Sequence, residues 1–262
     1  MKTELGTRTV RLFATCLIDA FRPDVGQAAV QVLEQAGVEV QFPSSQTCCG
    51  QFVFNAGYRQ QAAVLARHFV SVFQDESTPI VALSGSCAAM VVHEYPTLVI
   101  DGVAAGETAS WAAAARAVGG HVVEFSQWVA AHLTPSGAAA SAPRCLALHQ
   151  GCHMRRVLGE NAEPAQVLSR HGIEIQELVD ADQCCGFGGT YSMTEWAVST
   201  ALGDAKIAAL EEAGRRGAMG LVSADLGCLL HLQGRMRRRG LSWPVYHVAE
   251  VLREAMQPQG GE

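Results

Sequence analysis

The sequence lacks several features that would assign it to common classes of protein. No uninterrupted apolar run approaches the ~18 residues of a membrane-spanning helix, and the first ten residues hold no apolar segment typical of a secretory signal. Charge of one sign is not in large excess, since 17% of the residues are charged and the net charge is −6. We therefore expect a soluble, cytoplasmic protein that binds neither nucleic acid nor an anionic membrane. A short basic run comprises Arg235, Arg237, Arg238 and Arg239. We expect it to lie at the C-terminal end of a helix, where positive charge is favourable, and not to form a binding patch.

Several catalytic and binding motifs are also missing. No phosphate-binding loop of the G-x-x-x-x-G-K-[ST] type occurs, and the glycines at 186–189 lack the third glycine of a dinucleotide fingerprint, which excludes nucleotide binding. There is no G-x-S-x-G elbow for a serine hydrolase. No Cys-x-x-Cys pair is present, which argues against thiol–disulfide exchange.

Cysteine, by contrast, is abundant and regularly spaced. Cys-Cys-Gly occurs twice, and in each copy a single cysteine precedes it by 31 intervening residues and another cysteine follows. Eight of the nine cysteines thus form two matching sets of four, here called the first and second quartets. The first quartet is Cys16, Cys48, Cys49 and Cys87, and the second is Cys152, Cys184, Cys185 and Cys228. Only Cys145, within an apolar strand, lies outside them, and we expect it to be inert.

Two quartets of thiols predict two metal or cluster sites. Thiolate is a soft, charged donor that suits iron–sulfur clusters and zinc, and structural disulfides are rare in the cytoplasm. Neighbouring thiolates repel each other, so a cation would be needed to hold them together. The alternative, that these are buried cysteines acting as small apolar side chains, does not account for their registered spacing.

The framework between the cysteines is repeated as well. Residues 33–40 resemble residues 168–175, and in both halves short apolar strands alternate with helical patterns. This predicts an α/β fold of two pseudo-repeated parallel-sheet halves, with the cysteines at strand C-terminal ends and helix N-termini. The small, polar stretch 134–144 is a candidate linker, so we expect domains at 1–137 and 138–262.

Serines mark two of the expected helix starts. Ser126 is predicted to cap the helix after the strand at 121–125. Ser192 and Glu195 have capping-box spacing at the start of a helix that should reach Ala213.

These motifs resemble the CCG-domain family, whose members include the catalytic subunit of heterodisulfide reductase and the iron–sulfur subunit of glycolate oxidase. The matching stretches cover nearly the whole chain: Cys16-Leu-Ile-Asp, Gln46-Thr-Cys-Cys-Gly-Gln51, Ser84-Gly-Ser-Cys-Ala-Ala-Met90, His149-Gln-Gly-Cys-His153, Gln183-Cys-Cys-Gly-Phe-Gly-Gly189 and Asp225-Leu-Gly-Cys-Leu-Leu-His231. The chain looks most like members that act in lactate utilization. That resemblance implies an iron–sulfur subunit oxidising L-lactate to pyruvate, with companion lactate utilization proteins, one of them ferredoxin-like, as partners.

The chain departs from the family pattern at the closing Cys-x-x-Cys. Met90 and His231 stand where each last thiolate would lie, which argues against the five-cysteine noncubane clusters of heterodisulfide reductase. One or two [4Fe–4S] clusters held by four cysteines fit, and zinc is an alternative at one site. His231 and His153 are candidates to support the second site from beside its ligands, whereas His149 is expected to be partly buried with its hydrogen bonds satisfied.

Two other functions stay open at this point. The chain could act as a disulfide or heterodisulfide reductase subunit, in which substrate sulfur meets the cluster. It could instead be a zinc-stabilised binding module with no redox role. A ferredoxin-like cysteine run is absent, so any electrons must pass to another protein.

Overall fold

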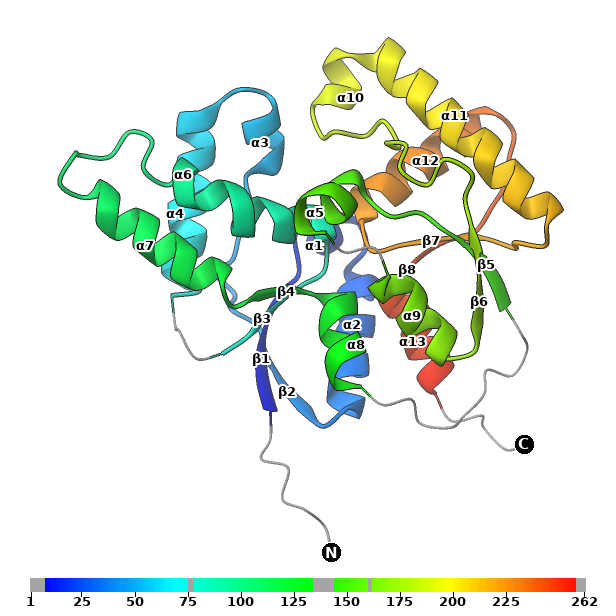
Figure 1. The fold of residues 1–262 in the computed structure, drawn as a ribbon, viewed down its shortest axis with the longest axis horizontal. Helices are drawn as coiled ribbons and strands as arrows, with labels where there is room; N and C mark the ends of the chain where they lie inside the picture. Colours follow the sequence, from blue (N-terminus) through cyan, green and yellow to red (C-terminus); the bar gives the residue numbers. More distant parts are fainter. Residues whose placement is uncertain (1–7, 75–77, 134–143, 160–161, 258–262) are drawn as a thin grey trace, which may run out of the picture.

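Two parallel sheets with the same topology organise the chain (Figure 1). The computed structural model describes residues 8–74, 78–133, 144–159 and 162–257. Within them the strand orders are β2-β1-β3-β4 and β6-β5-β7-β8, and every strand pair is parallel. The strands are β1 (Arg8–Phe13), β2 (Val38–Gln41), β3 (Ile80–Ala82), β4 (Val122–Glu124), β5 (Arg144–Leu148), β6 (Ile173–Glu177), β7 (Leu221–Ser223) and β8 (Val245–His247). The predicted α/β class with two pseudo-repeated halves is confirmed. Residues 134–143, which hold the expected domain boundary, lie outside the described ranges.

Helices connect the parallel strands in both halves. The first half contains α1 (Cys16–Phe21), α2 (Pro23–Gln35), α3 (Gln51–Asn55), α4 (Arg59–Val72), α5 (Gly85–Ala89), the π-helical turn η1 (Met90–Glu94), α6 (Tyr95–Leu98), α7 (Thr108–Gly119) and α8 (Phe125–His132). The second contains the π-helical turn η2 (Met154–Leu158), α9 (Glu163–Arg170), α10 (Tyr191–Thr194), α11 (Trp196–Arg215), α12 (Leu226–Arg238) and α13 (Val248–Met256). Among the described residues, no helix is both long enough and apolar enough to cross a bilayer.

Alternate residues of the first sheet face two different apolar layers. Phe13 and Ala82 lie in a cluster with α4, α6 and α7, whereas Leu12 and Val81 lie in a cluster shared with the second half. This alternation follows from the two-residue period of a strand. Because helices cover both faces of the sheet, the inner strand β3 is wholly apolar and buried.

The two halves meet through equivalent pairs of helices. Helix α2 packs on α13 and α8 packs on α9, while α5 contacts η2 and α1 contacts α12. By their places in the strand order, α2 corresponds to α9, α8 to α13, and α5 to α12. Each contact therefore recurs with the halves exchanged, which is the pattern of a pseudo-two-fold axis. Arg22 of the first half also forms an ion pair with Glu250 of the second, with Nη2 and Oε1 2.6 Å apart.

A buried acid and a buried histidine occupy equivalent helix caps at this interface. The predicted cap, Ser126, is wrong. Glu124 is the N-cap of α8, where its Oε2 accepts from the Ser126 backbone N–H at 2.7 Å and Gln127 completes a capping box. His247 caps α13 in the same way with Glu250. Sequence patterns favour serine at a helix cap. Glu124, however, stands at the end of β4, two residues before Ser126, and its longer side chain reaches the backbone amide that needs an acceptor.

Burial of Glu124 makes the stability of the fold depend on pH. Lack of solvent raises the pKa of this carboxyl from 4.5 to about 8, so the folded protein holds a proton that the unfolded chain has released. Stability is then lost as pH rises through this interval, by roughly 1.4 kcal/mol per pH unit. His247 acts oppositely, since burial lowers its pKa from 6.5 to about 4, but its effect ends near pH 6.5.

We therefore expect the free energy of unfolding to fall between pH 6.5 and 8, and Glu124→Gln to remove this part of the decline. Glutamine keeps the oxygen that accepts from the Ser126 amide but carries no charge. Denaturant titrations of the metal-free wild type and variant across this interval provide the measurement. The cysteines contribute equally to both proteins, so their contribution cancels when the two pH profiles are subtracted. If the free energy of unfolding fell equally with pH in both proteins, the assignment to Glu124 would be contradicted.

The long helix of the second half begins later than its sequence predicts. Ser192 lies inside α10, where its Oγ donates to the Gly189 carbonyl at 2.8 Å, and it is not the cap of α11. The N-cap of α11 is Glu195, which makes no side-chain capping bond. The capping-box prediction is therefore wrong, because the Ser192 hydroxyl donates to the glycine loop before it and does not cap α11.

Candidate metal centres

The first quartet comes from three places that the sheet brings to one edge. Cys16 begins α1 directly after β1, Cys87 lies in α5 after β3, and Cys48 and Cys49 lie in the loop between β2 and α3. The sulfur atoms are 3.4 Å apart between Cys16 and Cys48, and 3.3 Å apart between Cys49 and Cys87. The carboxyl ends of parallel strands share one edge, which explains why residues so distant in sequence converge.

Backbone amides also point at the first quartet. Gly50 adopts a left-handed conformation with φ of +84° and donates its N–H to Cys48 Sγ at 3.4 Å. Such a φ favours glycine, and it turns the chain immediately after the paired cysteines. Ser84 caps α5 by accepting from the Cys87 N–H at 3.3 Å, which orients the last cysteine of the quartet.

The second quartet repeats this arrangement. Cys152 follows β5, Cys228 lies in α12 after β7, and Cys184 and Cys185 lie in the loop after β6. The thiols of Cys152 and Cys184 are close enough to shift each other's pKa, as are those of Cys185 and Cys228, and all four line one cavity. The structure thus brings together the members of each predicted quartet.

The loop of the second quartet supplies more amides than that of the first. The Gly186 N–H donates to Cys184 Sγ at 3.3 Å, and the Phe187 N–H donates to Cys185 Sγ at 3.5 Å. Gly186, Gly188 and Gly189 all have positive φ. Successive amides of this kind form a concave, partly positive surface that favours thiolate and sulfide.

All nine cysteines are free thiols. The sulfur separations of 3.3 and 3.4 Å in the first quartet are well above the ~2.05 Å of a disulfide bond.

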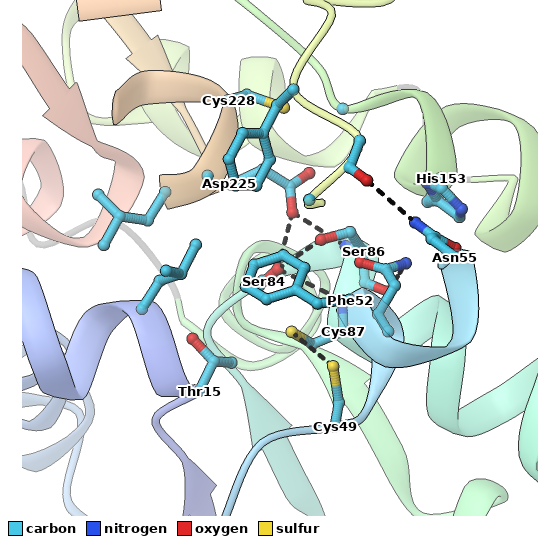
Figure 2. A pocket seen from close by; sticks show the side chains of 18 of the residues that line it. Thr15, Cys49, Phe52, Asn55, Ser84, Ser86, Cys87, His153, Asp225 and Cys228 are labelled. Atoms are coloured by element: carbon cyan, nitrogen blue, oxygen red, sulfur yellow. Dashed lines mark hydrogen bonds between the residues drawn. The ribbon is translucent and has the colours of Figure 1, made fainter. Parts of the chain in front are cut away.

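Both quartets open into one cavity between the two halves. Its lining includes all eight quartet cysteines together with Thr15, Leu17, Gln51, Phe52, Asn55, Ser84, Ser86, Gly151, His153, Phe187, Gly188, Gly189, Asp225, Leu226 and Gly227. Phe52 and Phe187, from opposite halves, meet edge to face with ring centroids 5.7 Å apart. Figure 2 shows Cys228 on one side of this space and Cys49 and Cys87 on the other. A molecule in the cavity would therefore lie between the two quartets.

Asp225 joins the halves between the two quartets. Its Oδ1 accepts from Ser84 Oγ at 2.7 Å and from the Ser86 N–H at 2.9 Å (Figure 2). It thereby adds a carboxylate at the N-terminus of α5, where a helix favours negative charge. Its Oδ2 is buried without a hydrogen-bond partner among the described residues, and a Cβ added at Gly151 would lie 2.0 Å from that oxygen. Sequence inspection missed this residue, although Asp225 and Ser84 each stand three positions before the last cysteine of a quartet.

The thiols are packed closely enough to share protons. The hydrogen bond between Cys16 and Cys48 holds the pKa of Cys48 well below its usual value and raises the pKa of Cys16. The hydrogen bond between Cys152 and Cys184 likewise lowers the pKa of Cys184 and raises that of Cys152. Each pair thus keeps one proton, because two adjacent thiolates repel. A bound cation removes that repulsion, so metal binding would release the retained protons.

The predicted supporting histidines lie in different settings. His153 lines the cavity, and its Nδ1 is 3.6 Å from Cys152 Sγ. His231 does not line the cavity but lies behind Phe187, with ring centroids 6.2 Å apart. Burial lowers the pKa of His231, which favours its neutral form.

His149 differs from its expected role. It is 1% exposed, and neither ring nitrogen has a hydrogen-bond partner among the oxygen and nitrogen atoms of the described residues. One ring nitrogen and the sulfurs of Cys185 and Cys228 all lie within 4.8 Å of one another. The expectation of a satisfied, partly buried imidazole is wrong, because the end of β5 directs this side chain under the second quartet. The sequence signal that could have linked His149 to the second quartet is its position three residues before Cys152.

The residues of both quartets fit a metal or iron–sulfur centre. All four donors of each quartet are soft thiols, amides are directed at their sulfurs, and an unpartnered buried imidazole adjoins one quartet. An apolar core would gain nothing from such a concentration of polar groups, since each unpartnered one costs free energy.

Comparison with known families agrees with this geometry. The model of the CCG family, described as a cysteine-rich domain, matches residues 10–92 and 146–233. The chain belongs to the CCG family. Each match of this CCG protein contains one quartet, so the duplicated domain and the duplicated site coincide.

Curated relatives of this CCG protein match it over almost their whole length. Lactate utilization protein A 1 of Bacillus cereus (strain AH820) is 40% identical over 244 residues, covering 93% of this chain and 98% of the relative. Lactate utilization protein A of Bacillus thuringiensis (strain Al Hakam) matches to the same extent, with 40% identity and the same coverage.

A solved structure supports the fold of the CCG protein. A hypothetical protein from Helicobacter pylori superposes with a TM-score of 0.67 at 11% identity, covering 97% of this chain. The chain spans 50% of that longer protein, so the likeness concerns the fold alone.

Proposed function

We propose that the protein is an iron–sulfur redox subunit of a cytoplasmic system that oxidises L-lactate to pyruvate. The observation that carries this proposal is the facing pair of cysteine quartets in a chain 40% identical, over 93% of its length, to proteins named lactate utilization protein A. In this proposal the eight quartet cysteines hold one or two [4Fe–4S] clusters.

The shared cavity suits a two-electron reaction. Oxidation of L-lactate to pyruvate releases two electrons and two protons, and iron–sulfur clusters accept electrons singly. A substrate in the cavity, beside the Phe52–Phe187 pair, would lie within reach of both quartets. Asp225 and His153, which line the same space, are the nearby groups that can accept protons.

Companion proteins complete the proposed pathway for electrons. The names of the relatives imply a system with several lactate utilization proteins, and we propose that a ferredoxin-like companion receives the electrons. This chain has no ferredoxin-like cysteine run of its own, so its centres need such an acceptor.

Anaerobic purification followed by iron, acid-labile sulfide and zinc analysis tests the cofactor. We expect iron and sulfide in both sites and a visible absorption that bleaches on reduction, and then bleaching by L-lactate when the companion proteins are present. Cys48→Ser combined with Cys184→Ser is the matched cluster-free control. Two zinc ions with no labile sulfide would overturn the redox proposal.

Zinc at one site is the second candidate, and the sulfur spacing favours it. Two thiolates on one tetrahedral zinc lie about 3.8 Å apart, given Zn–S bonds of about 2.3 Å. The separations of 3.3 and 3.4 Å in the first quartet are closer to this value than to the wider spacing around a four-iron cluster. The same metal analysis decides between them site by site.

A further inference from the structure

The two quartets rest on different residues, although their scaffolds are equivalent. Alignment of the sheets through β1 and β5 places Phe13 opposite His149, each three residues before the first cysteine of its quartet. Phe13 packs with Phe69 and Phe73 and shares a buried apolar cluster with Cys49 and Cys87. Beneath the second quartet, the same position carries an imidazole.

The imidazole of His149 lies beside two sulfur atoms, with one ring nitrogen and the sulfurs of Cys185 and Cys228 all within 4.8 Å of one another. Its side chain is 1% exposed, both ring nitrogens lack oxygen or nitrogen partners among the described residues, and Cys185 and Cys228 are the adjoining groups. A buried N–H without an acceptor destabilises the fold, because it has lost its hydrogen bonds to water. A thiolate at Cys228 supplies the acceptor, and it is a thiolate when it binds a metal.

We propose that His149 donates an N–H···S hydrogen bond to the Cys228 thiolate, so that the second centre is held more tightly and is more easily reduced than the first. A hydrogen bond to a ligand sulfur withdraws electron density from it, which stabilises the reduced state. Phe13 makes no such bond at the first centre. The duplicated sites are therefore chemically unequal, and an electron shared between two bound clusters would favour the second.

This inference rests on the proposed function only in that metal occupies the second quartet. His149→Phe replaces the imidazole by the aromatic ring that the first half carries at this position, which removes the donor. A Cys48→Ser background isolates the second centre, and a Cys184→Ser background isolates the first. His171→Phe is the matched control, because His171 is also buried with an unpartnered Nε2 but, unlike His149, is not grouped with Cys185 and Cys228.

Competition with a chelator and redox titration by EPR measure the effect. His149→Phe should weaken metal retention at the second centre by about 10–100-fold and lower its reduction potential, with no change at the first centre. The reciprocal Phe13→His, if it folds, should raise the potential of the first centre. His171→Phe should alter neither property.

Unchanged metal retention at the second centre of His149→Phe would overturn the inference, as would a wild-type second site without metal. Strong ¹⁵N hyperfine coupling in histidine-labelled protein would also overturn it, since that would make His149 a direct ligand. A protein that holds both centres, responds to His149→Phe and leaves L-lactate unoxidised would instead refute the lactate function alone.

Discussion

Cys184→Ser should abolish the visible chromophore of the second site and its share of the iron and sulfide, while the first site keeps its own. Cys184 carries the lowered pKa of its pair and accepts the Gly186 N–H at 3.3 Å, so it is the readiest thiolate of the second quartet. Serine preserves the shape of the side chain but its hydroxyl is a hard, weakly acidic donor. Iron and sulfide analysis with visible and EPR spectra of the anaerobic protein measures the loss.

Two further variants make this test specific. Cys48→Ser should empty the first site and leave the second, because the quartets share no cysteine. Cys145→Ser is the control, since Cys145 is buried in β5 and does not line the cavity. Identical spectra and iron content in the wild type and Cys184→Ser would refute the ligand assignment, and so would an equal loss in Cys145→Ser.

Gly186→Ala should destabilise the protein far more than Gly50→Ala, although both glycines follow a Cys-Cys pair. Both have positive φ, +91° and +84°, which costs an alanine about 1–2 kcal/mol. At Gly186 a Cβ would also lie 2.3 Å from the Ser199 carbonyl oxygen, which is fixed in α11. At Gly50 the nearest atom is 3.4 Å away, an ordinary contact.

The clash adds roughly 1–3 kcal/mol of overpacking at the second site, so we expect a total cost of about 2–5 kcal/mol for Gly186→Ala. Denaturant unfolding of the metal-free, reduced proteins gives both values without interference from cluster loss. Equal costs for the two variants would show that the second loop can move away from α11, against the packing described above.

Local sequence was sufficient to predict the repeated framework. Parallel strands produce short apolar runs followed by glycine turns, and this pattern can be read from neighbouring residues. The β-α order and the location of the cysteines at strand ends were therefore predictable. The helix caps were less predictable. Glu124 and Ser192 show that a loop or a longer side chain can take over a hydrogen bond that sequence statistics give to serine.

The sequence by itself determined that eight cysteines form two equivalent quartets, because the same spacing of cysteines occurs in both halves of the chain. Only the tertiary structure decided that both quartets face one cavity, since that depends on helices α2, α8, α9 and α13 packing across the pseudo-two-fold axis. The same packing placed Asp225 between the halves. The direction of one strand end brought His149 under the second quartet. Contacts between residues far apart in sequence leave no local pattern, because their partners are fixed by packing and not by spacing.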